Sequence, residues 1–213
     1  MSQFIYLSGA DGTGKSTQAR LLIENLAAHG LAVRHVWLRF PFLLSVPLLA
    51  FARWRGYSWQ EVQQGVRHGY WDFRRSWLLR ALLPWTLLFD ALIAALREIY
   101  PQLWRGRTVV CERFVLDMLV DLAVAFDDPQ IHRRLPGRLF LRLIPRGAAL
   151  AVLDLDAQTA RSRRPDLQSD QRLEERLRIF RMLGSDLSLR VFSSAQPIHE
   201  LNDQLLLMSR QGR

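Results

Sequence analysis

Cysteine and lysine are almost absent from this sequence: its 213 residues contain one of each, although the chain is basic. A single cysteine, Cys111, excludes an internal disulfide and a multi-cysteine zinc site. Such a composition is typical of a reducing compartment. We therefore expect a cytoplasmic protein.

A signal-like start and long uninterrupted apolar runs are also lacking. The opening MSQFIYLSGADG reaches glycine without the basic and apolar regions of a signal peptide. The run Phe40–Ala52 is too short to cross a bilayer, and Leu78–Leu96 is interrupted by Arg80, Pro84 and Asp90. We expect no membrane span.

Acidic residues are outnumbered, since 29 basic residues against 20 acidic ones give a net charge of +9. All the basic residues except Lys15 are arginine, a skew that genome base composition alone can produce. The excess charge fits either a solvated surface or a nucleic-acid-binding face. No block of five or more lysines and arginines occurs, so we expect small anionic partners and no nucleic acid.

What is present indicates one α/β domain over residues 1–213. With 49% hydrophobic and 23% charged residues, the chain can bury a sizeable core. Segments long enough for crossover helices separate the expected strands, so the strands are predicted to be parallel. The five predicted strands are Gln3–Ser8, Leu31–Leu38, Thr108–Cys111, Ala148–Leu155 and Leu189–Phe192.

A helical insert is predicted between the second and third strands, over residues 41–105. It is rich in Trp, Leu, Phe and Arg, which fits either a layer that covers the sheet or a membrane-surface role. We favour the covering layer, because no basic face separates cleanly from an apolar one. Its helices are expected to break at Pro41, Pro47, Gly56, Gly69 and Pro84. Another helix is expected from Gln171 onward.

The strongest motif lies between the first predicted strand and a predicted helix that runs from Ser16 to Gly30. It matches G-x-x-x-x-G-K-[ST], a loop whose backbone N–H groups and helix amino end bind phosphates. In such loops the lysine, here Lys15, reaches the β and γ phosphates, and the hydroxyl of Ser16 binds Mg²⁺. The loop and first helical turn comprise Gly9, Ala10, Asp11, Gly12, Thr13, Gly14, Lys15, Ser16 and Thr17.

Two charged residues follow the strand Thr108–Cys111. Ligands of open α/β sheets bind at the carboxyl ends of strands, where Glu112 and Arg113 are expected. The carboxylate of Glu112 is suited to Mg²⁺, and Arg113 to phosphate oxygens, although a surface ion pair is the simpler alternative.

Four motifs in order resemble those of thymidylate kinases: FIYLSGADGTGKSTQARLL, WLRFP near residue 40, CERF at 111–114 and AVLDLDAQTARSRR. The resemblance covers nearly the whole chain. It implies a P-loop three-layer α/β/α fold with a five-stranded parallel sheet, ATP and Mg²⁺ on the loop, and an arginine-rich lid over residues 156–172. It also implies catalytic roles for Lys15, Arg113, Arg163, Arg161 and Asp11, with Arg164 in the same lid.

By the same resemblance Arg39 and Arg113 would bind the acceptor's phosphate, and Phe89 would stack on its base. The adenine of ATP would lie near Ser194 and Ala195. The implied reaction moves the γ-phosphoryl group of ATP to a nucleoside monophosphate, with dTMP the first expectation.

The acceptor motifs depart from the family pattern. Positions that read thymine in the family hold Ile93, Asp117, Asp121 and Leu122, and Phe42 replaces a glutamate. Asp117 and Asp121 lie four residues apart on one helical face, where they fit either a hydroxyl-bearing acceptor or a solvated surface. Alternatives therefore remain a kinase of a non-nucleotide acceptor and an acceptor-independent nucleotide-binding protein. A homodimer contact, if formed, is expected on the apolar helices of the insert.

Overall fold

The computed structural model describes residues 3–39, 42–63 and 66–211. Its main sheet has five strands in the order β2-β5-β1-β6-β7, all paired in parallel. The sheet confirms the predicted fold class, and each strand overlaps its predicted segment. The bounds are β1 Phe4–Gly9, β2 Val33–Trp37, β5 Thr108–Glu112, β6 Ala149–Asp154 and β7 Arg190–Ser193.

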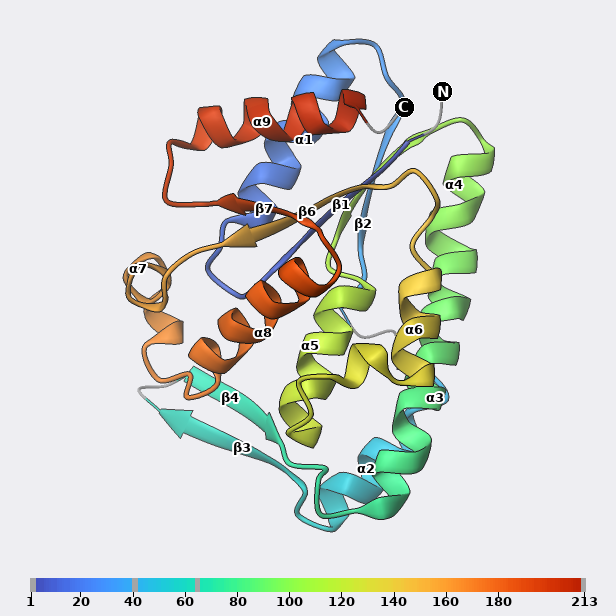
Figure 1. Ribbon diagram of the computed structural model, residues 1–213, viewed down its shortest axis with the longest axis vertical. Helices are drawn as coiled ribbons and strands as arrows, with labels where there is room; N and C mark the ends of the chain where they lie inside the picture. The colour runs from blue at the N-terminus through green and yellow to red at the C-terminus, as the bar shows by residue number, and fades with distance from the viewer. Residues whose placement is uncertain (1–2, 40–41, 64–65, 212–213) are drawn as a thin grey trace.

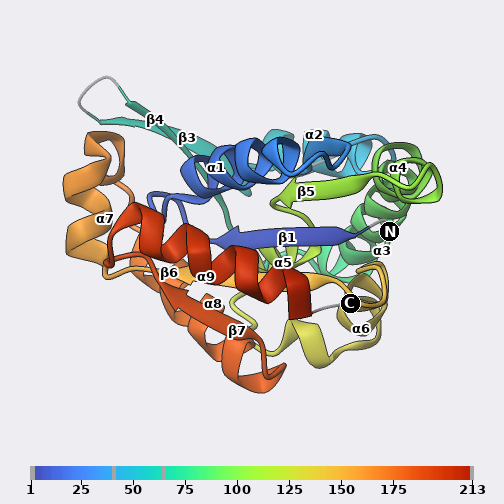
Figure 2. The same ribbon diagram turned by 90° about the horizontal axis from the view of Figure 1, so that it is seen from above.

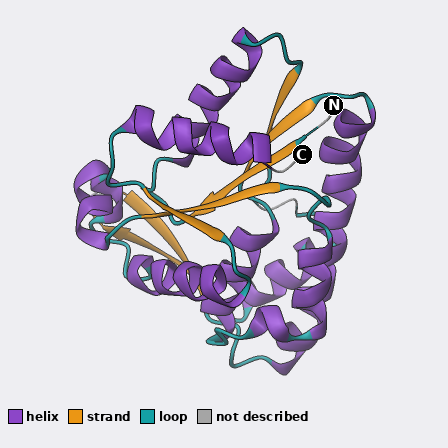
Figure 3. Cartoon of the chain, turned by 45° about the horizontal axis from the view of Figure 1, so that its top comes forward, coloured by secondary structure: helices purple, strands orange, loops and turns teal. Residues whose placement is uncertain are grey.

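Helices cover both faces of this sheet (Figures 1 and 3). In β1, Ile5 and Leu7 join an apolar cluster with α1 and α9, whereas Phe4 and Tyr6 join a larger cluster with α3, α5 and α8. Because both faces are buried, β1 is apolar from Phe4 to Leu7 rather than alternating. These helices are α1 Lys15–Ala28, α3 Trp77–Ala94, α5 Val115–Phe126, α8 Leu173–Asp186 and α9 Ile198–Gln211.

Shorter elements complete the chain. The shorter helices are α2 Val46–Trp54, α4 Tyr100–Trp104, α6 Leu135–Arg142 and α7 Ala157–Arg163. A π-helical turn, Ala95–Ile99, precedes α4, and the 3₁₀ turns Ile131–Arg133 and Pro165–Leu167 precede α6 and follow α7, respectively. Seen from above, α7 lies at the same end of the molecule as the loop between β1 and α1 (Figure 2). The segment predicted as the lid therefore lies beside the phosphate-binding motif.

The prediction of an all-helical insert is wrong. After α2 the chain forms an antiparallel hairpin, β3 Ser58–Gln63 with β4 Val66–Trp71. Gly69 pairs with Gln60 inside this hairpin and does not separate helices. The rings of Trp59 and Tyr70 lie opposite each other on the two strands, 5.9 Å between centroids, which is a pairing that stabilises hairpins.

Pro84 does not break a helix either. It lies inside α3 and is buried there, so the helix continues despite the missing backbone N–H. Pro47, by contrast, stands in the first turn of α2, where proline is favoured. Pro41 lies outside the described residues.

The run Trp77–Trp104 is long and apolar enough to cross a membrane by length and composition, with a mean hydropathy of 1.7. Half of its most apolar stretch is buried inside the molecule. The carboxylate of Asp90, also buried, accepts hydrogen bonds from the backbone N–H groups of residues 43–45, at 2.7–3.0 Å, and from the hydroxyl of Ser45. This packing supports the reading of the run as a layer that covers the core.

Candidate active site

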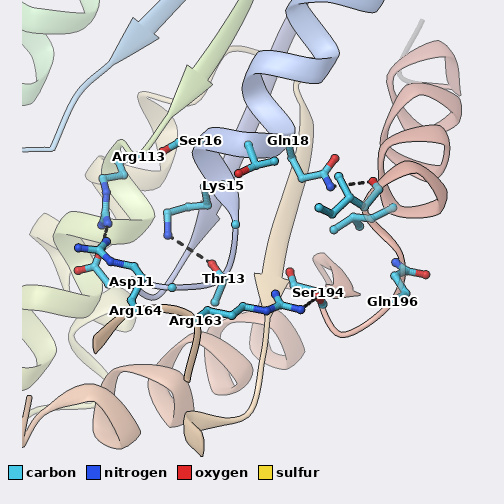
Figure 4. Close-up of a pocket in the computed structure, with 15 residues that line it drawn as sticks. Asp11, Thr13, Lys15, Ser16, Gln18, Arg113, Arg163, Arg164, Ser194 and Gln196 are labelled. Atoms are coloured by element: carbon cyan, nitrogen blue, oxygen red, sulfur yellow. Dashed lines mark hydrogen bonds and ion pairs between the residues drawn. The ribbon is translucent and has the colours of Figure 1, made fainter. Parts of the chain in front are cut away.

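The loop between β1 and α1 encloses the largest part of a cavity of about 460 Å³ (Figure 4). Gly9 must be glycine, because a Cβ there would lie 2.4 Å from the carbonyl oxygen of Leu153. Gly14 precedes α1 with a positive φ of 79°, and no side chain caps that helix end. The amino end of α1 therefore points free N–H groups at the cavity, as an anion site requires.

The side chain of Lys15 folds back onto its own loop. Its ammonium donates to the carbonyl oxygen of Ala10 at 2.5 Å and to the hydroxyl of Thr13 at 3.3 Å. Burial is the largest cause that lowers the pKa of Lys15 from 10.5 to about 8, and repulsion from Arg113 adds to it. The side chain is thus a buried cation that a phosphate group would stabilise.

Asp11, in the same loop, is the centre of an arginine cluster. It forms ion pairs with Arg113, with Arg39 at 3.5 Å and with Arg164 at 3.9 Å. Burial acts to raise the pKa of its carboxyl, but the neighbouring cations outweigh burial and lower it to about 2, with Arg113 the strongest of them. Asp11 is therefore ionised at every physiological pH and holds these guanidinium groups at the phosphate-binding loop.

Ser16 and Glu112 meet at the edge of the cavity. The hydroxyl of Ser16 donates to the carboxylate of Glu112 at 2.6 Å, and His35 lies 2.7 Å from the other carboxylate oxygen. Mg²⁺ prefers oxygen ligands and keeps several of its waters, so this pair fits an ion that also binds phosphates. Over residues 3–39, 42–63 and 66–211 no group of three or more His, Cys, Asp and Glu gathers as a metal site.

Arg113 follows β5 in a left-handed conformation, with φ at 59°. A non-glycine residue in this region is strained, and such strain concentrates at functional sites. Its backbone N–H donates to the carbonyl of Leu7, which fixes the turn against β1. The side chain is thereby aimed at Asp11 and at the phosphate-binding loop.

Asp117 does not lie on a solvated helical face. It is 2% exposed, and its carboxylate accepts hydrogen bonds from Tyr6 at 3.1 Å and Ser8 at 2.7 Å. Burial raises the pKa of Asp117, whereas Arg113, 3.4 Å away, acts to lower it. Because its oxygens already have donors within the protein, Asp117 positions Arg113 rather than offering a free carboxylate to a hydroxyl-bearing acceptor.

The carboxylate of Asp121, one turn further along α5, also has a partner within the protein. It pairs with Arg176 of α8 at 3.3 Å, and Arg176 also pairs with Asp170 at 2.8 Å. Asp121 and Asp117 line a narrow space that also includes Arg39. The solvated-surface alternative is thus wrong for both carboxylates.

The structure separates the three lid arginines. Arg163 and Arg164 line the cavity, and Arg163 donates to the carbonyl oxygen of Ser194 at 2.9 Å. Arg161 turns away from the cavity and pairs with Glu174 at 2.9 Å. The lid packs closely on the loop, since a Cβ at Gly12 would lie 2.9 Å from the side chain of Leu167.

The far end of the cavity has a mixed polar and apolar lining without charged side chains. It is lined by Ser194, whose buried hydroxyl has no hydrogen-bond partner within the part of the chain that the structure describes, and by Gln18, Gln196, Ile198 and Leu201. Ala195 does not line it. Sequence reasoning missed Gln18, whose amide donates to the carbonyl of Ile198 and so joins α1 to α9.

A second cavity, of about 80 Å³, has Arg39 in its wall, and Arg39 pairs with Asp11 of the phosphate-binding loop. Sequence reasoning missed most of its wall, because part of that wall comes from the unpredicted hairpin. Phe89 does not line it: this side chain is 50% exposed on α3. The lining residues are Arg39, Gly69, Tyr70, Trp71, Asp121, Val124, Ala125, Arg172 and Arg176.

A glycine-rich loop at the end of a parallel strand, a buried lysine inside it and arginines from a covering segment define the class of P-loop phosphotransferases. The chain is similar to curated thymidylate kinases. It is 31% identical to that of Symbiobacterium thermophilum over 86% of this chain and 76% of the relative, and 33% identical to that of Ruegeria pomeroyi over 81% and 72%.

A third curated thymidylate kinase, from Gluconobacter oxydans, is 36% identical over 52% of this chain and 43% of the relative. No family model matches the sequence. On the first two similarities, the chain belongs to the thymidylate kinase family and is a nucleoside monophosphate kinase.

Proposed function

We propose that this enzyme transfers the γ-phosphoryl group of ATP to dTMP in the presence of Mg²⁺. The observation that carries the proposal is the cavity around Lys15, which joins the phosphate-binding loop, the strained Arg113 and the lid arginines in one site. The acceptor is taken from the relatives, all three of which are named thymidylate kinase.

On this proposal the polyphosphate of ATP lies in the loop, held by its backbone N–H groups and by Lys15. A phosphate oxygen of the acceptor, bound by Arg39 and Arg113, attacks the γ-phosphorus, and the bond to the β–γ bridging oxygen breaks to release ADP. Arg163 and Arg164 balance the charge on the transferring group and exclude water. The protein's work is positioning and charge stabilisation.

Ser16 and Glu112 are the residues that would hold Mg²⁺. The ion supplies charge neutralisation on the phosphates when bound. Ser194 and Ala195 remain the predicted neighbours of the adenine, and the orphan hydroxyl of Ser194 is a donor suited to a ring nitrogen. The cytoplasmic location and the homodimer contact on the insert remain predictions.

The proposal is tested by ADP release with a panel of nucleoside monophosphates, nucleosides and sugars. We expect the highest kcat/KM with dTMP. Turnover without any acceptor at the maximal rate would instead indicate a nucleotide-dependent binding protein.

One observation favours a second candidate, a kinase of a non-nucleotide acceptor. The cavity beyond Arg39 is lined by aromatic rings, arginines and Asp121, without an asparagine, glutamine, serine or threonine in its described wall. The polar groups that are present are engaged within the protein, since Arg176 pairs with Asp121 and Arg172 with Glu175. Base discrimination requires hydrogen-bonding groups that face the base, and their loss costs orders of magnitude in selectivity. Equal activity with dTMP, dUMP and dCMP, and higher activity with a sugar phosphate, would establish this candidate.

A further inference from the structure

The carboxyl end of α2 and the start of α3 lie at the lower end of Figure 1, away from the loop between β1 and α1, and they carry two exposed tryptophans and several exposed arginines. We call this region the tip and define it by Arg53, Trp54, Arg55, Arg75, Trp77 and Arg80. The carboxyl end of α2 and the start of α3 lie side by side there. The backbone N–H of Asp72, just before α3, donates to the carbonyl of Tyr57, just after α2, at 2.9 Å, which joins the two segments.

The tip leaves large apolar groups in water. Trp77 is 79% exposed and Trp54 is 77% exposed, although most tryptophans in folded proteins are highly buried. The guanidinium of Arg55 lies 5.8 Å from the ring of Trp54, a cation–π contact that keeps the indole and the charge on one surface. Exposed rings of this size, rimmed by polar groups, mark interaction sites.

Charge decides what the tip can contact. From residue 42 to residue 97 the only acidic residues are Glu61, which is half-buried, and Asp72 and Asp90, which are buried. Asp72 pairs with the tip residue Arg75 at 3.6 Å and with Arg74 at 2.9 Å, and Asp127, which follows α5, also pairs with Arg74 at 3.5 Å. Within the described part of the chain, neither Arg53 nor Arg80 forms a salt bridge. The tip is therefore positive, and its partner must be negative.

A second copy of this chain does not meet that requirement. A two-fold contact places the same patch on both sides, so the arginines of one tip would face those of the other. Indole and guanidinium side chains together suit the boundary between lipid headgroups and acyl chains, where the ring is partly dehydrated and the charge meets phosphate.

We propose that the tip docks on the surface of an anionic lipid bilayer. The contact is peripheral, because the apolar face of α3 remains packed against the core. The two indoles enter the headgroup layer, and the arginines contact lipid phosphates. The active-site cavities contain none of the tip residues, so docking leaves them open to soluble substrates.

The test is co-sedimentation of the full chain with vesicles of phosphatidylcholine, with and without phosphatidylglycerol. We expect binding that requires phosphatidylglycerol and weakens with salt. The variant Arg53→Gln/Arg55→Gln/Arg80→Gln should bind about a hundredfold more weakly, because each arginine near the surface contributes roughly tenfold or less. Trp54→Ala/Trp77→Ala should lose about tenfold or more.

Matched controls lie at the opposite end of the same helical run. Trp104 is 76% exposed, and Arg105 and Arg107 are exposed beside it. Trp104→Ala and Arg105→Gln/Arg107→Gln should bind vesicles like the unmodified chain. All variants should keep their melting temperature and their turnover with soluble substrates, which separates this proposal from the assignment of the reaction.

Three outcomes would overturn the proposal. Equal binding of tip and control variants to phosphatidylglycerol vesicles would place the contact elsewhere. Loss of a dimer on tip substitution, measured by light scattering, would identify a second copy as the occupant. Displacement of vesicles by an oligonucleotide that binds the tip more tightly would assign the surface to nucleic acid.

Discussion

The two halves of the active site are built in different ways. The phosphate-binding side is built on one continuous stretch, β1, the loop and the start of α1, in which Thr13 and Lys15 both donate to the carbonyl oxygen of Ala10. The acceptor side is assembled from four separate segments: Arg39 after β2, the hairpin, α5 and α8. The first side is specified by local sequence, and the second by tertiary packing.

The difference explains which features follow from the sequence. Glycines at fixed spacing, a lysine and a serine are required by phosphate chemistry itself, so the loop can be recognised without a structure. The wall of the acceptor cavity depends on contacts between residues roughly fifty to over a hundred positions apart, such as that of Arg176 with Asp121. No periodicity in the sequence encodes those contacts.

The largest effect is expected from removing the charge of Lys15 in the phosphate-binding loop. Lys15→Met should lower kcat by at least about 10³-fold, because the buried ammonium is the donor at the centre of the loop. Single-turnover kinetics with ATP and dTMP would measure it. Arg20→Met removes an exposed cation from the same helix and should leave kcat unchanged; equal loss in both variants would refute the role of Lys15.

A smaller loss is expected in the lid. Arg163→Ala should reduce kcat by about 10²–10³-fold, because Arg163 lines the cavity, whereas Arg161→Ala should change it less than about twofold. Both were implied as catalytic by the family resemblance, and the geometry favours only the first. Steady-state kinetics of the two variants would measure both effects. A larger loss in Arg161→Ala than in Arg163→Ala would show that the lid rearranges on closure.

The free-energy cost of burying the charged ammonium of Lys15 should make the stability of the fold depend on pH. Its pKa is about 8 in the folded chain and 10.5 in the unfolded chain, so the unfolded state binds the extra proton between these values. The folded state is therefore penalised at pH 7, by about 3 kcal/mol at most, and regains stability as the pH rises through this window.

Lys15→Met removes this penalty, so we expect the variant to be more stable than the unmodified chain at pH 7. The gap should narrow as the pH rises above 8. Urea unfolding of both proteins at pH 7, 8 and 9 would measure it. A constant gap over that range would mean that Lys15 keeps an ordinary pKa.

The smallest effect concerns the acceptor side. Trp71→Ala should raise the KM for the acceptor about tenfold with little change in the KM for ATP, because Trp71 lines the second cavity and not the cavity around Lys15. Phe89→Ala, which alters a half-exposed side chain outside that cavity, should leave both constants nearly unchanged. The opposite result would return the stacking role to Phe89.

Much of the fold could be predicted from the sequence, because five apolar segments with long spacers define a parallel sheet. The hairpin could not be predicted in the same way. Its strands carry Gln, Glu, Arg and His among the aromatics, and Gly69 and Pro84 suggested helix ends that tertiary contacts override. The aromatic pair Tyr70 and Trp71 before Asp72 was the available signal.

The site shows the same division. Glu112 and Arg113 were found because strand ends meet at one edge of a sheet, a rule that needs no side-chain contact. Asp117 was placed on a helix face correctly, but its partners Tyr6 and Ser8 lie more than a hundred residues away. Arg176 lies in the helix expected from Gln171 onward, but its ion pairs with Asp121 and Asp170 depend on packing that the helical pattern does not reveal.

Asp11 places an anion of the protein itself among the arginines that bind phosphate. Its single carboxylate offsets part of their charge, so an incoming phosphate competes with Asp11 for the guanidinium groups. A ligand of higher valence that reaches several cations at once therefore displaces the carboxylate more readily than a monovalent anion does. The carboxylate can pair with the arginines again once product has left.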